Sequence, residues 1–367
     1  FVEVPGIKDS THFRFWLFTK DKLKETRKRL NQGAQERIKK RNNSADIKPL
    51  SAKEERHMRL YFHNQLFAAC ARYRFPFDVT ATVHTFWKRF YLSRSIMDFD
   101  PRLILPTVIY LATKAEECHI NCEELARMYK LKNEWITKNE VPVMEGLNFQ
   151  LKVYHAKRPI KEYVARLRKN PLVPDGNLDK MEKLAQQLVL DSYFTDACLY
   201  YPPAQIALAS LMMINRKEKV IEEQSLIESC VNTGGEKVSA YEEKLKRRLE
   251  EVGGMLKKGE ELAKTWASEK KKKLNEAAAK IYVKKIKPCL DPLLNPSTEE
   301  YKKQEEDNNK EAEAARMKKR KRRRQEEEAR ERKLLGSDEP DDGQPFTIKR
   351  NKSFKPKPRP SPPPDLM

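Results

Sequence analysis

Residues 101–117 read PRLILPTVIYLATKAEE, and this stretch decides the fold. Asp100 stands directly before Pro101, an order that commonly begins a helix, because proline lacks the N–H that a first turn cannot pair. The residues that follow are apolar on almost every side, so we expect this helix in the centre of a helical domain. A second stretch of the same kind, PPAQIALASLMMI, occupies residues 202–214. Two such helices about 100 residues apart indicate two similar helical domains.

Four further helices are expected around residues 101–117, which makes a set of five. Ser51 and Glu54 match a capping box at the start of the first of them, and Asp78 can cap the second. Pro142 falls inside the fifth helix, where its missing N–H predicts a kink or a late start. The four expected spans are 52–73, a helix that carries residues 79–91, 121–129 and 133–147.

A second set of about five helices follows the turn YHAKRP at residues 154–159. It repeats the order of the first set, with a long amphipathic helix before the apolar one and shorter helices after it. Only 11 glycines occur in 367 residues, which argues against a β protein built on glycine turns. The sequence therefore predicts an all-α protein with two tandem five-helix domains. The expected spans of the second set are 159–169, 178–195, 202–215, 222–230 and 239–257.

Both ends of the chain extend beyond these domains. The aromatic cluster FRFWLF at residues 13–18 precedes a charged helix that Thr19 can cap, and Trp266 lies in a lysine-rich amphipathic stretch near the other end. Such apolar residues are unusual in free tails, so we expect both flanking helices to pack on the first domain. Beyond residue 290 the chain is charged and then Pro-rich, and is expected to be largely disordered, with a solvated helix as the alternative for residues 298–333. The expected division is 1–50 N-terminal extension and helix, 51–152 first domain, 153–257 second domain, 258–290 C-terminal helix and 291–367 tail.

The sequence carries no sign of an enzyme, a metal site or a membrane span. It has no P-loop, no G-x-G-x-x-G, no H-E-x-x-H and no G-x-S-x-G motif. The six cysteines are scattered without a C-x-x-C pair, which favours free thiols in a reducing nuclear or cytosolic compartment. No apolar run approaches the roughly 18 residues that cross a bilayer. We therefore expect no catalytic residue, no cofactor, no metal and no membrane partner.

The formal net charge is +21, and the densest basic run is KKRKRRR. Such a run is typical of a nuclear import signal or of a nucleic-acid contact, although a solubilising surface is also possible. No aromatic residues interleave with it to stack on bases, so nuclear import is favoured and direct nucleic-acid binding is not expected. The residues of this run are Lys318, Lys319, Arg320, Lys321, Arg322, Arg323 and Arg324.

Four sequence segments carry a family resemblance. They are FWKRFYL at residues 86–92, LATKAEE at 111–117, LNFQL at 147–151 and FTDACLYYPPAQIALASL at 194–211. Together they resemble the cyclin family, and within it the cyclin H branch, over roughly residues 10–285. The resemblance implies two tandem cyclin folds with extra N- and C-terminal helices.

The resemblance also implies a function. Cyclins of this branch are non-enzymatic subunits that activate a cyclin-dependent kinase, which phosphorylates other such kinases and the tail of RNA polymerase II. It implies as partners the kinase catalytic subunit, a RING-finger assembly factor and the TFIIH core, in the nucleus. Two alternatives stay open: another transcriptional cyclin, or a nucleic-acid-binding transcription factor with cyclin folds. No N-terminal zinc ribbon is visible to support the latter.

Within the resemblance, one pair of residues carries the kinase contact. Cyclins place a lysine near the end of the third helix and a glutamate on the fifth, and here these are Lys114 and Glu140. A lysine offers three donors and a carboxylate two acceptor oxygens, so the pair can bind main-chain groups near the kinase αC helix. Ala115 stands where many cyclins have an aromatic residue, and Met144 can pack on αC one turn after Glu140.

Overall fold

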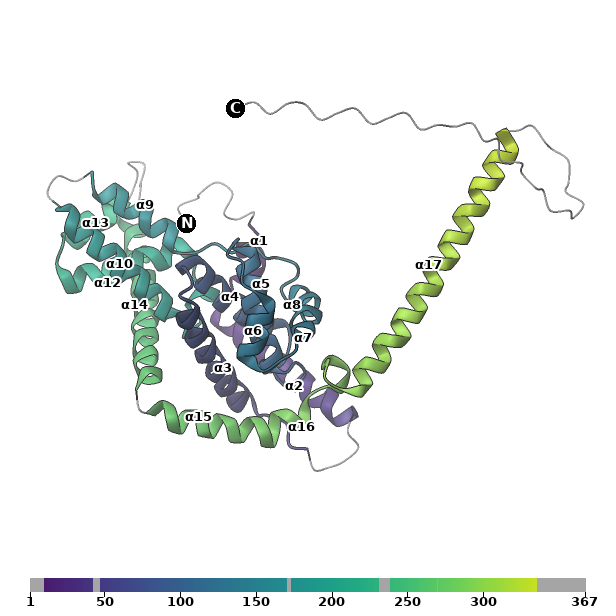
Figure 1. Cartoon of the computed structure of the whole chain (residues 1–367). Helices are drawn as coiled ribbons and strands as arrows, with labels where there is room; N and C mark the ends of the chain where they lie inside the picture. The colour runs from purple at the N-terminus through teal and green to yellow at the C-terminus, as the bar shows by residue number, and fades with distance from the viewer. Residues whose placement is uncertain (1–9, 42–46, 170–172, 231–237, 269, 335–367) are drawn as a thin grey trace, which may run out of the picture. The chain divides into compact units, whose positions relative to one another are not determined.

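The computed structural model describes residues 10–41, 47–169, 173–230, 238–268 and 270–334. These residues form helices, turns and loops and contain no strand, as the sequence predicts. The chain divides into two compact units, residues 1–304 and residues 305–367. Figure 1 shows the helices of the first unit arranged as two bundles.

The first bundle is the first five-helix fold, with its fifth helix divided in two. Helix α5 lies in the centre, and α3, α4, α6, α7 and α8 all contact it (Figure 1). Its apolar residues are buried on nearly all sides, from Leu103 to Thr113. The helices are α3 (Ala52–Tyr73), α4 (Phe77–Ser93), α5 (Pro101–Ala115), α6 (Cys122–Tyr129), α7 (Asn133–Lys138) and α8 (Glu140–Gly146).

Side-chain caps fix where three of these six helices begin, namely α3, α5 and α6. The Asp100 carboxylate accepts a hydrogen bond from the backbone N–H of Arg102 at 2.9 Å, and Ser51 with Glu54 forms the expected capping box. The prediction for Asp78 was wrong, because α4 begins one residue earlier, after Pro76, without a side-chain cap. The Asp78 carboxylate instead accepts a hydrogen bond from Lys157 at 2.6 Å.

The fifth helix breaks at Asn139, which ends α7 and precedes α8. Pro142 explains the break, because it has no N–H to donate to the carbonyl of Lys138, four residues earlier. The bond from the Val143 N–H to the Asn139 oxygen, at 3.0 Å, restores the helical pattern one residue later. Glu140 consequently stands at the first position of a new helix.

The second bundle has α12 at its centre, and α9, α10, α13 and α14 pack around it. Two features differ from the sequence expectation. The single turn α11 lies between α10 and α12, and α14 continues without a break through residue 257. The helices are α9 (Lys157–Leu167), α10 (Asp175–Ser192), α11 (Ala197–Tyr200), α12 (Pro203–Glu218), α13 (Glu223–Cys230) and α14 (Val238–Ala267).

Aromatic and polar contacts join the two bundles. The ring of Phe67 on α3 stacks on that of Phe194, with centroids 4.2 Å apart. The Lys88 ammonium of α4 donates to the Thr195 oxygen at 2.7 Å. Lys88 is nearly fully buried, and its ammonium also lies 3.5 Å from the Asp196 carboxylate, so this charge has both a hydrogen-bond acceptor and an ion-pair partner between the bundles.

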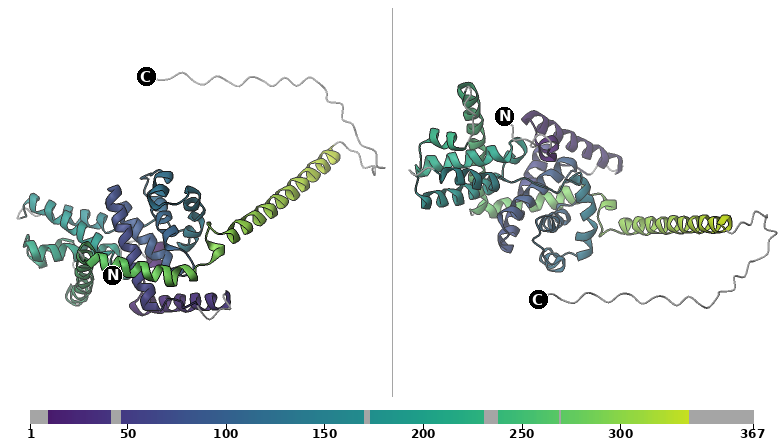
Figure 2. Two further views of the ribbon diagram at one scale, coloured as in Figure 1. Left: turned by 60° about the horizontal axis from the view of Figure 1, so that its bottom comes forward. Right: turned by 90° about the horizontal axis from the view of Figure 1, so that it is seen from above.

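The helices before residue 51 and those between residues 270 and 289 pack on the first bundle, as the sequence predicts. The prediction was wrong for Trp266, which lies in α14, and α14 packs on α10 and α12 of the second bundle. At the N-terminal end, Trp16 is buried and its indole N–H donates to the Gln150 side chain at 2.6 Å. Near the other end, Ala278, Tyr282 and Ile286 join the hydrophobic core of the first bundle, and Figure 2 shows α15 along its surface. Phe15 does not pack, since 53% of its surface is exposed. The flanking elements are α1 (Thr11–Trp16), α2 (Lys20–Arg41), α15 (Lys270–Ile281), a π-helical turn (Tyr282–Ile286), α16 (Lys287–Cys289) and a 3₁₀ turn (Pro292–Leu294).

The charged segment after these turns is one long helix, α17 (Glu299–Leu334). From residue 306 to residue 331 every side chain is exposed, and ion pairs such as Arg322–Glu326 and Arg323–Glu327 link successive turns. The Pro-rich segment that the sequence analysis places at the end of the tail lies outside the described residues.

Candidate functional site

The structure brings Lys114 and Glu140 into direct contact. The ammonium of Lys114 donates to the Glu140 carboxylate at 2.7 Å, and 44% and 16% of the two side chains are exposed. The hydrogen bond with Glu140 raises the pKa of Lys114, so the lysine stays charged. Lys114 lies in the last turn of α5 and Glu140 in the first turn of α8. Each charge therefore also complements the dipole of its own helix.

Apolar side chains stand exposed on α8 and in the turn that follows it. Val141 follows Glu140 directly and 52% of its surface is exposed, and the Phe149 side chain after α8 is 64% exposed. Phe149 and the preceding Asn148 both have positive φ, 55° and 52°, a conformation that costs a bulky residue of the order of 1–3 kcal/mol. The Phe149 N–H donates to the Met144 oxygen at 2.8 Å and helps to hold the turn. The strain in this turn makes the exposed Phe149 ring a candidate partner contact.

The other two predicted contact residues differ in accessibility. Ala115 is exposed at the end of α5 and adds a small, flat area next to Lys114. Met144 is half-buried and packs partly on the core of the first bundle, so only part of its side chain can reach a partner. Sequence analysis missed Val141 and Phe149. Phe149 lies within the quoted LNFQL motif, but a motif does not reveal which of its residues point outward.

The described residues show no arrangement typical of metal binding. Among them, no group of three or more His, Cys, Asp or Glu side chains is placed to hold an ion. His63 and His84 lie 2.7 Å apart between the bundles, but burial lowers the pKa of both well below its usual value. They pack among Phe67, Phe194 and Tyr193, so their role is in the core. None of the described helices has both the length and the apolar composition to cross a bilayer.

The basic run on α17 keeps its charges in solvent. All seven residues from Lys318 to Arg324 are exposed, and only Arg322 and Arg323 have ion-pair partners within the described part of the chain. A receptor could reach the whole run without unfolding the helix.

Comparison with known proteins supports the resemblance over most of the first unit. The model of the cyclin N-terminal domain matches residues 30–152, and that of the cyclin C-terminal domain matches residues 155–257. The N-terminal match contains the Lys114–Glu140 pair and the C-terminal match contains α12.

Similar sequences and structures come from several eukaryotes. Cyclin-H1-1 of Arabidopsis thaliana is 32% identical over 61% of this chain and 74% of its own length. A putative cyclin-H of Dictyostelium discoideum is 27% identical over 55% of this chain and 73% of its own. A chain of the Chaetomium thermophilum CAK complex bound to ATP-γ-S superposes with a TM-score of 0.69 at 26% identity, over 78% of this chain and 89% of that one. This chain therefore belongs to the cyclin family and groups with its cyclin H members.

Proposed function

We propose that this chain is the activating, non-catalytic subunit of a cyclin-dependent kinase, and that it binds the kinase through the face around Lys114 and Glu140. The observation that carries the proposal is the direct pairing of these two residues at the junction of α5 and α8. Exposed apolar side chains lie on α8 and just after it. We refer to Lys114, Ala115, Glu140, Val141, Met144 and Phe149 together as the α5–α8 face.

The α5–α8 face combines polar anchors with apolar area. In the pair, Lys114 uses one of its three donors on Glu140, and one carboxylate oxygen accepts that bond. The remaining donors and acceptor can bind main-chain groups at a helix end of the kinase, where such groups lack partners. Val141 and Phe149 would lose their exposed apolar surface in the complex.

Activation follows from fixing one helix of the kinase. A protein kinase is active when the glutamate of its αC helix pairs with the β3 lysine. A partner that binds αC in this position shifts the kinase toward the active state, because it binds that state more tightly than the other. The well-packed first bundle is suited to this task, since α5 and α8 contact each other directly.

The proposed binding partners and the proposed role in transcription are assigned from the relatives of this chain. The relative Cyclin CCL1 of Saccharomyces cerevisiae is 26% identical over 62% of this chain and 60% of its own length. Ccl1 is also named as a component of the yeast TFIIK complex, Kin28/Ccl1/Tfb3. One chain of that complex shares the fold of this chain, with a TM-score of 0.55 at 22% identity. The match covers 68% of this chain and 99% of that one. We assign to this chain a corresponding place in a CDK-activating kinase complex, with a RING-finger assembly factor, attached to the TFIIH core. There it would act in phosphorylation of the polymerase II tail and of cell-cycle kinases.

The remaining segments take supporting roles in this proposal. The helices before residue 51 and those between residues 270 and 289 support the first fold, and the exposed run from Lys318 to Arg324 directs the protein to the nucleus. Rat cyclin-C is also similar, 29% identical over 55% of this chain and 68% of its own length, so a role as a different transcriptional cyclin is the second candidate. The nucleic-acid-binding alternative has less support, because all the relatives named above are cyclins.

A pull-down with the full chain tests the proposal. The chain should recover a cyclin-dependent kinase from nuclear extract and stimulate its activity on a polymerase II tail peptide. Variants Lys114→Ala and Glu140→Ala should recover much less of it. Recovery of a different transcriptional kinase would favour the second candidate, and recovery of no kinase would remove the basis of the proposal.

A further inference from the structure

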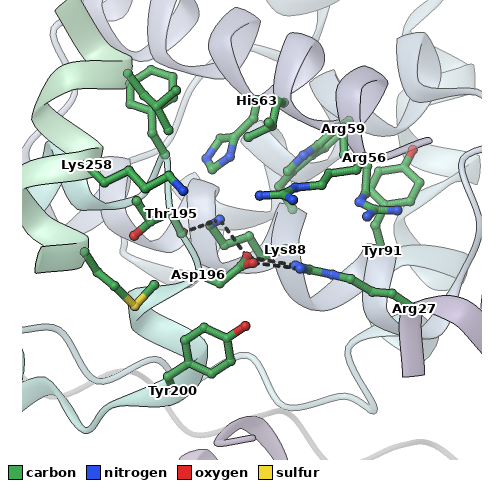
Figure 3. Close-up of a pocket in the computed structure, with 15 residues that line it drawn as sticks. Arg27, Arg56, Arg59, His63, Lys88, Tyr91, Thr195, Asp196, Tyr200 and Lys258 are labelled. Atoms are coloured by element: carbon green, nitrogen blue, oxygen red, sulfur yellow. Dashed lines mark hydrogen bonds and ion pairs between the residues drawn. The ribbon is translucent and has the colours of Figure 1, made fainter. Parts of the chain in front are cut away.

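A cavity of about 220 Å³ lies between the two bundles and shares no lining residue with the α5–α8 face. Helices α2, α3 and α4 form one side of it, and the segment 194–200 with α14 forms the other (Figure 3). Because a water molecule needs only about 10–15 Å³ of such space, the cavity can hold a polyatomic ion with its waters. Its charged lining residues are Arg27, Arg56, Arg59, Lys88, Asp196 and Lys258.

Positive charge in this cavity exceeds negative charge. The Asp196 carboxylate accepts two hydrogen bonds from the Arg27 guanidinium, at 2.7 and 2.8 Å, and lies 3.5 Å from the Lys88 ammonium. Figure 3 shows Arg27 and Lys88 converging on that carboxylate. The five basic lining residues meet two acidic groups, Asp196 and the Glu55 that contacts Arg59, which leaves three positive charges uncompensated.

The basic residues that lack close partners are the ones that face the open part of the cavity. The Arg59 guanidinium lies 3.5 Å from Glu55, but that carboxylate also accepts hydrogen bonds from Asn31 and Ser95. Only 14% of the Arg59 side chain is exposed, and this burial lowers its pKa to about 10. Arg56 and Lys258 have no ion pair with any described residue, and both are exposed. Charge of one sign in a half-buried space attracts an anion more strongly than the same charge in water.

We propose that this cavity binds a phosphate group. Arg56 and Arg59 stand three residues apart on α3 and therefore share one side of the helix, so their planar forks can bind two phosphate oxygens each. Lys258 on α14 supplies a charge from the opposite wall. A phosphate dianion would balance most of the three excess charges, whereas a carboxylate would balance one. The phosphate could be free or could belong to a phosphorylated side chain of a partner protein.

The test uses the full chain and inorganic phosphate as the probe, in calorimetric titrations near neutral pH at constant ionic strength. Acetate replaces phosphate in a parallel titration. Two variants, Arg56→Ala and Lys258→Ala, remove exposed side chains that make no ion pair, so the fold should be retained, and circular dichroism checks this. Arg72→Ala is the matched control, because Arg72 is an exposed arginine of the same helix outside the cavity.

Wild-type protein should bind phosphate saturably, and each of the two variants should bind it about tenfold more weakly, a difference of about 1.4 kcal/mol. Arg72→Ala should bind like the wild type. Equal binding of acetate, or equal weakening by Arg72→Ala, would mean general attraction by a basic surface and would overturn the proposal, as would absence of phosphate binding.

A second titration distinguishes the two sources. A phosphoserine peptide that competes with phosphate, when its unphosphorylated form does not, would assign the site to a phosphorylated partner. Competition by neither peptide, with phosphate binding intact, would assign it to free phosphate. Neither result depends on the kinase, so the outcome is independent of the α5–α8 face.

Discussion

Replacing Lys114 or Glu140 with alanine should leave the fold stable and weaken kinase binding strongly. In the free protein the two charges are paired at 2.7 Å, with 44% and 16% of the side chains exposed, and such pairs contribute about 0–1 kcal/mol to stability. The pKa of Lys114 is raised by the pair, so this contribution is fully present at neutral pH and is lost only as the pH rises through that pKa. Each variant should therefore lose less than about 1 kcal/mol of unfolding free energy.

The effect on binding should be larger, because the complex removes water from both charges. Truncating one partner of a desolvated charge pair typically costs about 2–5 kcal/mol, which is about 30-fold to several-thousand-fold in affinity. Lys114→Ala should cost at least as much as Glu140→Ala. Glu140 is the less exposed of the two and has little access to water once its partner is gone, whereas Lys114 can turn toward solvent. Because the residues act as a pair, the double variant should lose less than the sum of the single losses.

Calorimetry with the purified kinase subunit and thermal melting of the free chain measure the two quantities. Lys180→Ala is a suitable control, because Lys180 forms a similar exposed ion pair with Glu218 in the second bundle, with 60% and 30% of the side chains exposed. It should change neither binding nor melting appreciably. Unchanged kinase binding in both Lys114→Ala and Glu140→Ala would refute the assignment of the α5–α8 face.

Further predictions concern other parts of the chain. Trp16→Ala should lower the unfolding free energy by about 3–5 kcal/mol in urea titrations, because the ring is buried and Arg89 stacks on it; a loss below about 1 kcal/mol would contradict the packing of α1. A chain that ends at residue 304, the limit of the first unit, should melt and activate the kinase like the full chain, and a loss of either would mean that α17 has a structural role. Replacing all seven residues from Lys318 to Arg324 with alanine should reduce nuclear accumulation of a fluorescent fusion, whereas unchanged localisation would reject the import role. Burial lowers the pKa of His12 to about 3, so the unfolded chain takes up a proton at acid pH that the folded chain does not. His12 should therefore cost about 2 kcal/mol of stability between about pH 7 and about pH 5, and a His12→Asn variant that shows the same pH dependence as the wild type would exclude this cause.

The elements that sequence analysis predicted correctly depend on neighbouring residues alone. The capping box of Ser51 and Glu54 closes within one turn, and the Asp100 cap acts on a residue two positions away. Apolar runs such as residues 101–113 have few alternatives to the centre of a bundle. Such local rules fix the number and order of helices, and with them most of the fold.

What the sequence could not show depends on contacts between distant residues. Asp78 had the chemistry of a cap, but it pairs with Lys157, 79 positions away. Helix α14 continues past residue 257 because its later part still has a surface to pack on, with Trp266 buried, and a change in composition does not reveal that surface. The cationic cavity also gathers residues from five separate segments. The sequence shows these charges only as part of a generally basic chain.

The α5–α8 face shows how a local defect produces a long-range contact. Lys114 and Glu140 were expected at one partner surface from the resemblance, but their direct pairing was not, since 26 residues separate them. Pro142 interrupts the fifth helix, and the break at Asn139 makes Glu140 the first residue of α8. There its carboxylate meets the positive end of its own helix dipole and the ammonium at the end of α5. An unbroken helix from Asn133 to Gly146 would place Glu140 in its middle, without that dipole and on a different helical axis. Pro142 has a low helix propensity and interrupts the fifth helix, and this interruption is what positions Glu140 for its contact with Lys114.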